Sequence, residues 1–168
     1  VHTIRRPRPD EFQIKEAAEK IKSSKNPIII SGGGVFYSDA MEELSQFAIK
    51  HNIPVTQTVM GYSTMKRDHS HFAGQIGGLG GKNTNTLAKE TDLAIAVGTK
   101  LADFTTGSWA NFENENFKLV SINVSRYDAN KHLAQAVVGD AKVSLTELSQ
   151  ALGAVSYTHL TLPTSTLV

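Results

Sequence analysis

Three consecutive glycines, Gly32, Gly33 and Gly34, are the residues whose type and position first suggest ligand binding. They follow the apolar run 28–30, which is typical of a strand buried on both faces of a parallel sheet. Glycine lets the chain turn sharply after such a strand and lets backbone N–H groups approach a phosphate closely. The same glycines also suit a turn without a ligand, so the sequence leaves both interpretations open.

Three further segments follow predicted strands and carry glycine or polar side chains: residues 58–64, 98–103 and 123–128. In an open parallel sheet, ligands bind outside the carboxyl ends of the strands. We therefore expect these segments to meet the glycine turn at one edge of the sheet, with Asp128 suited to accept hydrogen bonds from a ribose. The glycine-dense stretch 77–81 either joins this edge or only makes turns.

Other chemistries are poorly supported. The dinucleotide fingerprint fails because Tyr37 stands where its third glycine should be, and the second strand ends without an acidic residue. His69 and His71 beside Asp68 have metal-ligand chemistry, but their spacing favours a solvated loop. The chain has no cysteine and no G-x-S-x-G motif. We therefore predict no catalytic residue and no metal ligand within this sequence.

The elements that must position the glycine turn alternate between strands and helices, which predicts parallel βαβ units. The fold class is α/β: a three-layer parallel sheet of five to six strands with helices on both faces, Rossmann-like and similar to DHS-like nucleotide-binding domains. Asp10 and Asp140 are expected to cap the first and last helices, and Ser38 or Asp39 a middle one. Strands are expected from residue 27 and over 53–58, 92–97, 118–124 and 134–138, and helices over 10–22, 39–52, 83–89 and after 140.

The composition excludes several partners. The chain has 168 residues and a formal net charge of +1, so nothing favours nucleic acid, and no apolar run reaches the roughly 18 to 20 residues that span a membrane. We expect a cytoplasmic protein. Arg5, Arg6 and Arg8 alternate with prolines, which favours a solvated linker over a basic binding patch.

The predicted organisation has three parts: a linker over 1–9, a domain over 10–154 and a non-native tail over 155–168. Residues 156–168 contain no Asp, Glu, Lys or Arg and are rich in Thr and Leu, unlike the rest of the chain. The first residue is Val rather than Met. We expect the sequence to be a piece of a longer protein.

Six segments occur in the order PIIISGGG, IPVTQTVMG, HFAGQIGGLGG, DLAIAVGTKLADFTTG, INVSRYDANK and VVGDAK. Over residues 10–152 this order resembles the central domain of thiamine-diphosphate-dependent enzymes of the acetohydroxyacid synthase type. The resemblance implies a three-domain subunit that forms a homo-oligomer. It also implies that thiamine diphosphate and Mg²⁺ are held by the N- and C-terminal domains, because the activating glutamate and a Gly-Asp-Gly segment lie there. Here Gly139-Asp140 continues with Ala141.

Within the family, QTVMGYSTMKRDH, GTKLADFTTGSWANF and SINVSRYDANKHLAQAVVGDAK resemble members that hydrolyse a C–C bond of a cyclic diketone in inositol catabolism. The resemblance implies a central scaffold domain that is inactive alone. Two alternatives stay open. One is a synthase-like enzyme that binds FAD or ADP on this domain, and the other is an independent nucleotide-binding module.

Flavin-containing members bind the ADP part of FAD on this domain, which implies a cofactor site here. Two positions depart from the flavin-type pattern: Lys100 and Leu101 replace a basic-aromatic pair, and Asn123 replaces an aspartate. A scaffold role without flavin is therefore the expectation for the hydrolase type. The matching positions are Gly32, Gly33, Gly34, Thr58, Val59, Met60, Gly98, Thr99, Lys100 and Asn123.

Overall fold

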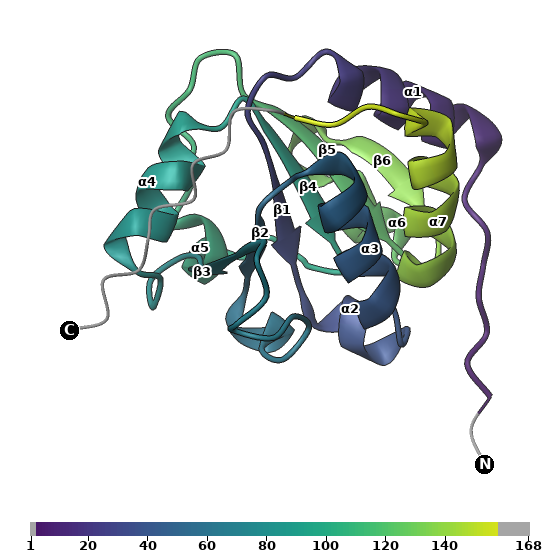
Figure 1. The fold of residues 1–168 in the computed structure, drawn as a ribbon, viewed down its shortest axis with the longest axis horizontal. Helices are drawn as coiled ribbons and strands as arrows, with labels where there is room; N and C mark the ends of the chain where they lie inside the picture. Colours follow the sequence, from purple (N-terminus) through teal and green to yellow (C-terminus); the bar gives the residue numbers. More distant parts are fainter. Residues whose placement is uncertain (1–2, 158–168) are drawn as a thin grey trace.

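The structure is a computed structural model and describes residues 3–157. Six strands form one sheet in the order β3-β2-β1-β4-β5-β6, and every neighbouring pair is parallel (Figure 1). The expected α/β class with five to six parallel strands is confirmed. The strands are β1 (Pro27–Ser31), β2 (Val55–Gln57), β3 (Phe72–Gln75), β4 (Leu93–Val97), β5 (Lys118–Asn123) and β6 (Gln135–Val138).

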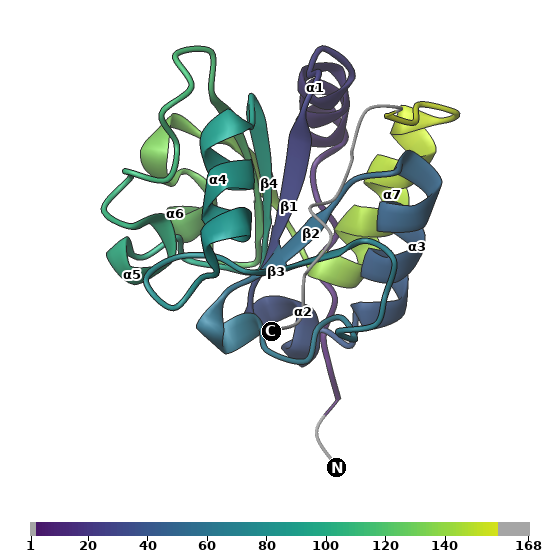
Figure 2. The same ribbon diagram turned by 60° about the vertical axis from the view of Figure 1, so that its left-hand side comes forward.

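Helices cover both faces of the sheet, which gives the three layers that the alternation predicted. Figure 2 shows α1, α3 and α7 on one face and α4, α5 and α6 on the other. The helices are α1 (Glu11–Lys22), α2 (Gly33–Tyr37), α3 (Met41–His51), α4 (Lys82–Glu90), α5 (Asp103–Thr106), α6 (Arg126–Ala129) and α7 (Ala141–Leu152), with short 3₁₀ turns η1 (Val59–Gly61) and η2 (Lys131–Leu133).

The core consists of two apolar layers, one on each face of the sheet. Ile29 packs with the α1, α3 and α7 side, whereas Ile28 and Ile30 pack with the α4 side, and all three side chains are fully buried. Consecutive strand residues point to opposite faces, so a strand that is apolar at every position needs cover on both. Each such side chain contributes roughly 1.5–3 kcal/mol through burial.

The predicted caps are confirmed for the first and last helices and wrong for the middle one. The Asp10 carboxylate accepts from Phe12 N at 2.9 Å, and the Asp140 carboxylate accepts from Lys142 N at 3.1 Å. Asp39 instead has a φ of 52°, and α3 begins after Ala40 with no side-chain cap. The reason is that α2 begins within the glycine turn, at Gly33, and the chain needs a left-handed residue after it to connect to α3.

Strand β3 lies at the sheet edge and was not predicted at its position. Its four residues include Gly74 at φ 108°, and its register against β2 shifts between Val55 and Thr56. Its formation depends on pairing with β2 rather than on local alternation. The short helices α5 and α6 were likewise not predicted.

The two ends of the described chain lie against the domain. Asp140 N donates to Pro7 O at 2.8 Å, so part of the predicted linker is docked on the β6–α7 turn. Near the other end, Tyr157 N donates to His51 O at 3.1 Å, and His51 Nδ1 donates to Val155 O at 2.6 Å. The tail over 155–168 stays a prediction, and residues 158–168 of it lie outside the described part. Among the described residues, no helix has the length and apolar character needed to span a membrane.

Candidate ligand site at the carboxyl edge of the sheet

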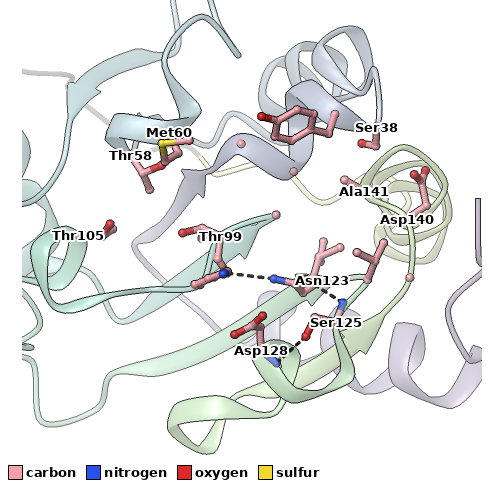
Figure 3. Close-up of a pocket in the computed structure, with 18 of the residues that line it drawn as sticks. Ser38, Thr58, Met60, Thr99, Thr105, Asn123, Ser125, Asp128, Asp140 and Ala141 are labelled. Atoms are coloured by element: carbon pink, nitrogen blue, oxygen red, sulfur yellow. Dashed lines mark hydrogen bonds between the residues drawn. The ribbon is translucent and has the colours of Figure 1, made fainter. Parts of the chain in front are cut away.

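A cavity of about 740 Å³ lies outside the carboxyl ends of β1, β4 and β5 (Figure 3). Strand β1 continues to β2 on one side, whereas the crossover to β4 places the second half of the sheet on the other. The turns after β1 and β4 touch at Gly34 and Gly98, and the chain then runs from them toward opposite halves of the sheet. This arrangement leaves a crevice, which is where open α/β sheets bind ligands. The volume falls within the range of small-molecule sites.

Nine of the ten predicted site residues line this cavity, and Gly32 does not. Segments 32–37, 58–64, 98–103 and 123–128 each contribute to the lining, as the sequence predicted. The stretch 77–81 does not contribute, and Gly77 instead approaches the backbone of Phe104. That these residues bind a ligand stays a prediction.

The glycines of the two turns are required by chain packing. A Cβ on Gly32 would lie 2.5 Å from Gly98 O, and one on Gly34 would lie 2.6 Å from Gly98 Cα. Gly98 itself has a φ of 60°, whereas Gly33 is not in the left-handed region. The floor of the cavity is thus built by backbone touching backbone, which only glycine permits.

Asn123 joins two of the loops that form the cavity. Its Nδ2 donates to Thr99 O at 3.2 Å, and its Oδ1 accepts from Ser125 N at 2.9 Å, both drawn in Figure 3. The Thr99 carbonyl needs a donor, which the Asn123 amide supplies and an ionised aspartate at this position would lack. Asparagine therefore fixes the β4 and β5 loops to each other.

Asp128 lies on the cavity wall formed by α6. Lys131 Nζ donates to its carboxylate at 2.8 Å, and this bond is the main cause that lowers the pKa of Asp128 below its ordinary value. The Ser125 hydroxyl accepts from Asp128 N at 3.3 Å and so caps α6. Asp128 is held ionised, in a position to accept hydrogen bonds from a ligand hydroxyl.

The lining is apolar on most of its surface and carries two cations. Lys100 and Arg5 form no ion pair among the described residues, whereas Asp128 pairs with Lys131 and Asp140 with Arg6. Besides Lys131, the charge of Lys100 also lowers the pKa of Asp128. Among residues 3–157, Arg5 is therefore the lining cation that interacts with no carboxylate of the lining. The lining also has large apolar side chains against which a flat ring can pack, namely Tyr37, Val59, Met60, Phe104 and Val124.

Several lining residues were missed by sequence reasoning. Ile4 and Arg5 belong to the predicted linker, and Gly139, Asp140 and Ala141 follow β6, which lies far from β1 in the sheet order. The docking of the N-terminal segment beside β6 brings these residues to the cavity. The carboxyl ends of all strands in a parallel sheet lie at the same edge, and this rule could have predicted that the residues after β6 lie near the cavity.

None of the residues that line the cavity is a histidine or a cysteine. His69 and His71 lie elsewhere. His69 Nε2 bonds to the Ser45 hydroxyl at 2.9 Å, and His71 Nε2 donates to Asn52 Oδ1 at 2.9 Å. Within residues 3–157, no group of three or more His, Asp or Glu side chains is arranged to hold a metal ion.

The strand order and the cavity at the reversal point define a Rossmann-like α/β domain. Residues 14–148 match the family described as "Thiamine pyrophosphate enzyme, central domain". The chain belongs to this family, as the order of its motifs indicated.

Two curated relatives are similar to nearly the whole chain. It is 44% identical over 157 residues to 3D-(3,5/4)-trihydroxycyclohexane-1,2-dione hydrolase 2 of Bacillus cereus, covering 94% of this chain and 24% of that protein. It is 43% identical over 157 residues to 3D-(3,5/4)-trihydroxycyclohexane-1,2-dione hydrolase of Clostridium perfringens, covering 94% of this chain and 25% of that protein. The chain thus spans about a quarter of these relatives.

A solved structure of benzoylformate decarboxylase from Polynucleobacter necessarius superposes with a TM-score of 0.72 at 22% sequence identity. The match covers 92% of this chain and 29% of that one. At this identity, the likeness supports the fold.

Proposed function

We propose that this chain is the central scaffold domain of an enzyme that depends on thiamine diphosphate and hydrolyses a C–C bond of 3D-(3,5/4)-trihydroxycyclohexane-1,2-dione. The observation that supports it most is the 44% identity to a hydrolase named for this substrate, over 157 residues. The motifs that the sequence shares with this branch surround the cavity, so the resemblance includes the candidate site.

In this proposal the domain holds the other domains of the parent in position and supplies no catalytic residue. Thiamine diphosphate acts as an electron sink for carbon–carbon chemistry when bound. The described residues of this chain do not fit it, because they offer no metal cluster and the sequence has no Gly-Asp-Gly segment. We place the cofactor and Mg²⁺ on the parts of the parent beyond this chain, and we expect a cytoplasmic homo-oligomer.

The test is an assay of the full-length parent with thiamine diphosphate, Mg²⁺ and the cyclic diketone. The expected result is loss of the diketone with formation of a product heavier by one water. The matched control is pyruvate, the substrate expected of the synthase alternative. Turnover of pyruvate without turnover of the diketone would contradict the hydrolase proposal.

A second candidate function is binding of a nucleotide such as ADP, or the ADP part of FAD, in the cavity. One observation favours it: nine of the ten positions that match the flavin site of flavin-containing members line one cavity. Titration calorimetry of the 168-residue chain with ADP and FAD tests it. Micromolar affinity is expected if the site is functional, and absence of heat with either ligand would leave the cavity a structural feature.

A further inference from the structure

Residues 3–9 run along one side of the cavity mouth and are held there by a specific anchor, Arg6. Its Nη1 donates to Ser38 O at 2.5 Å and to the Asp140 carboxylate at 3.0 Å. Ser38 ends α2 and Asp140 begins α7, so one guanidinium joins the two turns that flank the mouth. A charged donor with two acceptors on different elements holds its chain in one place.

The acceptor of this anchor is itself fixed. The Asp140 side chain is 3% exposed and its carboxylate also accepts from Lys142 N and Val143 N at the start of α7. The segment is docked at two further points. Asp140 N donates to Pro7 O at 2.8 Å, and a Cβ on Gly139 would lie 2.9 Å from Pro9 N. The close packing at Gly139 and the hydrogen bond at Pro7 give the segment a defined path.

This path places Ile4 and Arg5 in the lining of the cavity. Arg5 and Lys100 approach from separate segments, the first from the N-terminal segment and the second from the loop after β4. Neither forms an ion pair within residues 3–157, although the charge of Lys100 also acts on the Asp128 carboxylate. Together with the apolar walls, they suit a ligand that has a ring and an anionic group.

We propose that residues 3–9 form a strap that completes the carboxyl-edge site, with Arg5 binding the anionic group of the ligand. Arg6 is the positioning residue that keeps Arg5 at the mouth. The proposal rests on the proposed nucleotide binding and adds to it a residue and a charge preference. It also changes the interpretation of the arginine cluster, which sequence reasoning favoured as a solvated linker.

The experiment compares ADP with adenosine, which has the ring and ribose but no phosphate, by calorimetry on the 168-residue chain. The variants are Arg5→Ala, Arg6→Ala and the control Arg8→Ala. Arg8 is a matched strap cation that pairs with Glu147 at 2.7 Å and does not line the cavity. Hydrogen exchange of the Asp140 amide reports whether the strap is docked, because that N–H donates to Pro7 O.

We expect Arg5→Ala and Arg6→Ala to weaken ADP binding about tenfold, as for loss of one charged contact. Adenosine affinity should change less than twofold in every variant, and Arg8→Ala should behave as the unaltered chain with both ligands. Asp140 exchange should quicken in Arg6→Ala and stay slow in Arg5→Ala. If Arg6→Ala does not fold, the comparison of Arg5→Ala with Arg8→Ala still tests the proposal, because the Arg5 side chain forms no ion pair among residues 3–157 and its loss leaves the Arg6 anchor intact.

ADP binding that is equal in the unaltered chain, Arg5→Ala and Arg6→Ala would overturn the strap proposal and leave nucleotide binding intact. An equal loss of adenosine affinity in Arg5→Ala would overturn the charge preference. Absence of ADP binding by the unaltered chain would overturn both proposals together.

Discussion

Gly34 and Gly98 contact each other backbone to backbone at the point where β1 and β4 end. Gly34 N donates to Gly98 O at 2.9 Å, and a Cβ added to either residue would lie 2.6 Å from the Cα of the other. Both residues line the cavity. The shape of the candidate site and the stability of the sheet therefore depend on the same contact.

Gly98→Ala is expected to lower the free energy of unfolding by about 2–4 kcal/mol. The substitution combines a strained φ of 60° with a backbone clash that no side-chain rotation relieves. Urea denaturation followed by circular dichroism measures the change. Gly34→Ala carries the clash without the positive φ, and we expect about 1–3 kcal/mol.

Gly107→Ala is the matched control for this substitution. Gly107 also has a φ of 60°, but the nearest atom to its added Cβ is the Asn111 side-chain amide at 3.3 Å, which can move. We expect a loss of about 1–2 kcal/mol from the left-handed backbone alone. Equal losses for Gly98→Ala and Gly107→Ala would contradict the backbone contact as the cause.

Asp140→Ala should destabilise the domain by about 1–3 kcal/mol, because it removes the α7 cap and leaves Arg6 without its carboxylate. Asp140→Asn keeps an oxygen for the cap but loses the charge, so it should recover most of the stability. Asp10→Ala removes a cap without an ion pair and is the control. Thermal melting compares the three, and a larger loss for Asp10→Ala would count against the double role of Asp140.

Stability should fall as the pH drops below about 6.5. Burial is the main cause that lowers the pKa of His51, and burial followed by the charge of His69 lowers that of His71. In this window the unfolded chain binds more protons than the folded one, so acidification favours unfolding. The contribution is fully present above pH 6.5, the ordinary value, and is lost as the pH falls from there through the lowered pKa of the folded state.

Unfolding free energies at pH 7.5 and 5.5, measured for the unaltered chain and for His51→Gln, test this dependence. The variant should be less stable at pH 7.5 and should depend less on pH. The titration of the Asp92 carboxylate does not contribute to the difference between pH 7.5 and 5.5. Burial raises its pKa, but bonds from Ser24 and from the Lys25 and Asn26 amides lower it overall, so its contribution is lost only in more acidic solution. An identical pH dependence in the variant would show that His51 is not responsible.

Truncation separates the described end of the chain from the rest of the predicted tail. A chain ending at Tyr157 should match the unaltered chain in melting temperature. A chain ending at Ala154 should lose about 1–3 kcal/mol, because His51 Nδ1 loses Val155 O and Asn52 Nδ2 loses Tyr157 O. If both truncated chains melt alike, residues 155–157 add nothing to the domain.

Much of the candidate site was predictable because its main segments share one local pattern, a buried strand followed by glycine or polar residues. The Ile28–Ile30 run and the apolar strand before Gly98 predicted both turns, and parallel pairing then required them to meet. Asp128 was found in the same way. Strand β3 escaped prediction because Gly74 interrupts its alternation and its pairing partner supplies its order.

The sequence by itself determined the parallel α/β class, the caps at Asp10 and Asp140, and the family. Strand burial and capping depend on residues close together in the chain, and the family follows from motifs that can be read in order along it. Only the tertiary structure decided what the glycines touch and where the arginines lie. Gly34 meets Gly98 across 64 residues, and Arg6 meets Asp140 across 134. Such contacts form only when the sheet has brought its carboxyl ends to one edge, since local propensity carries no information about which distant turns become neighbours.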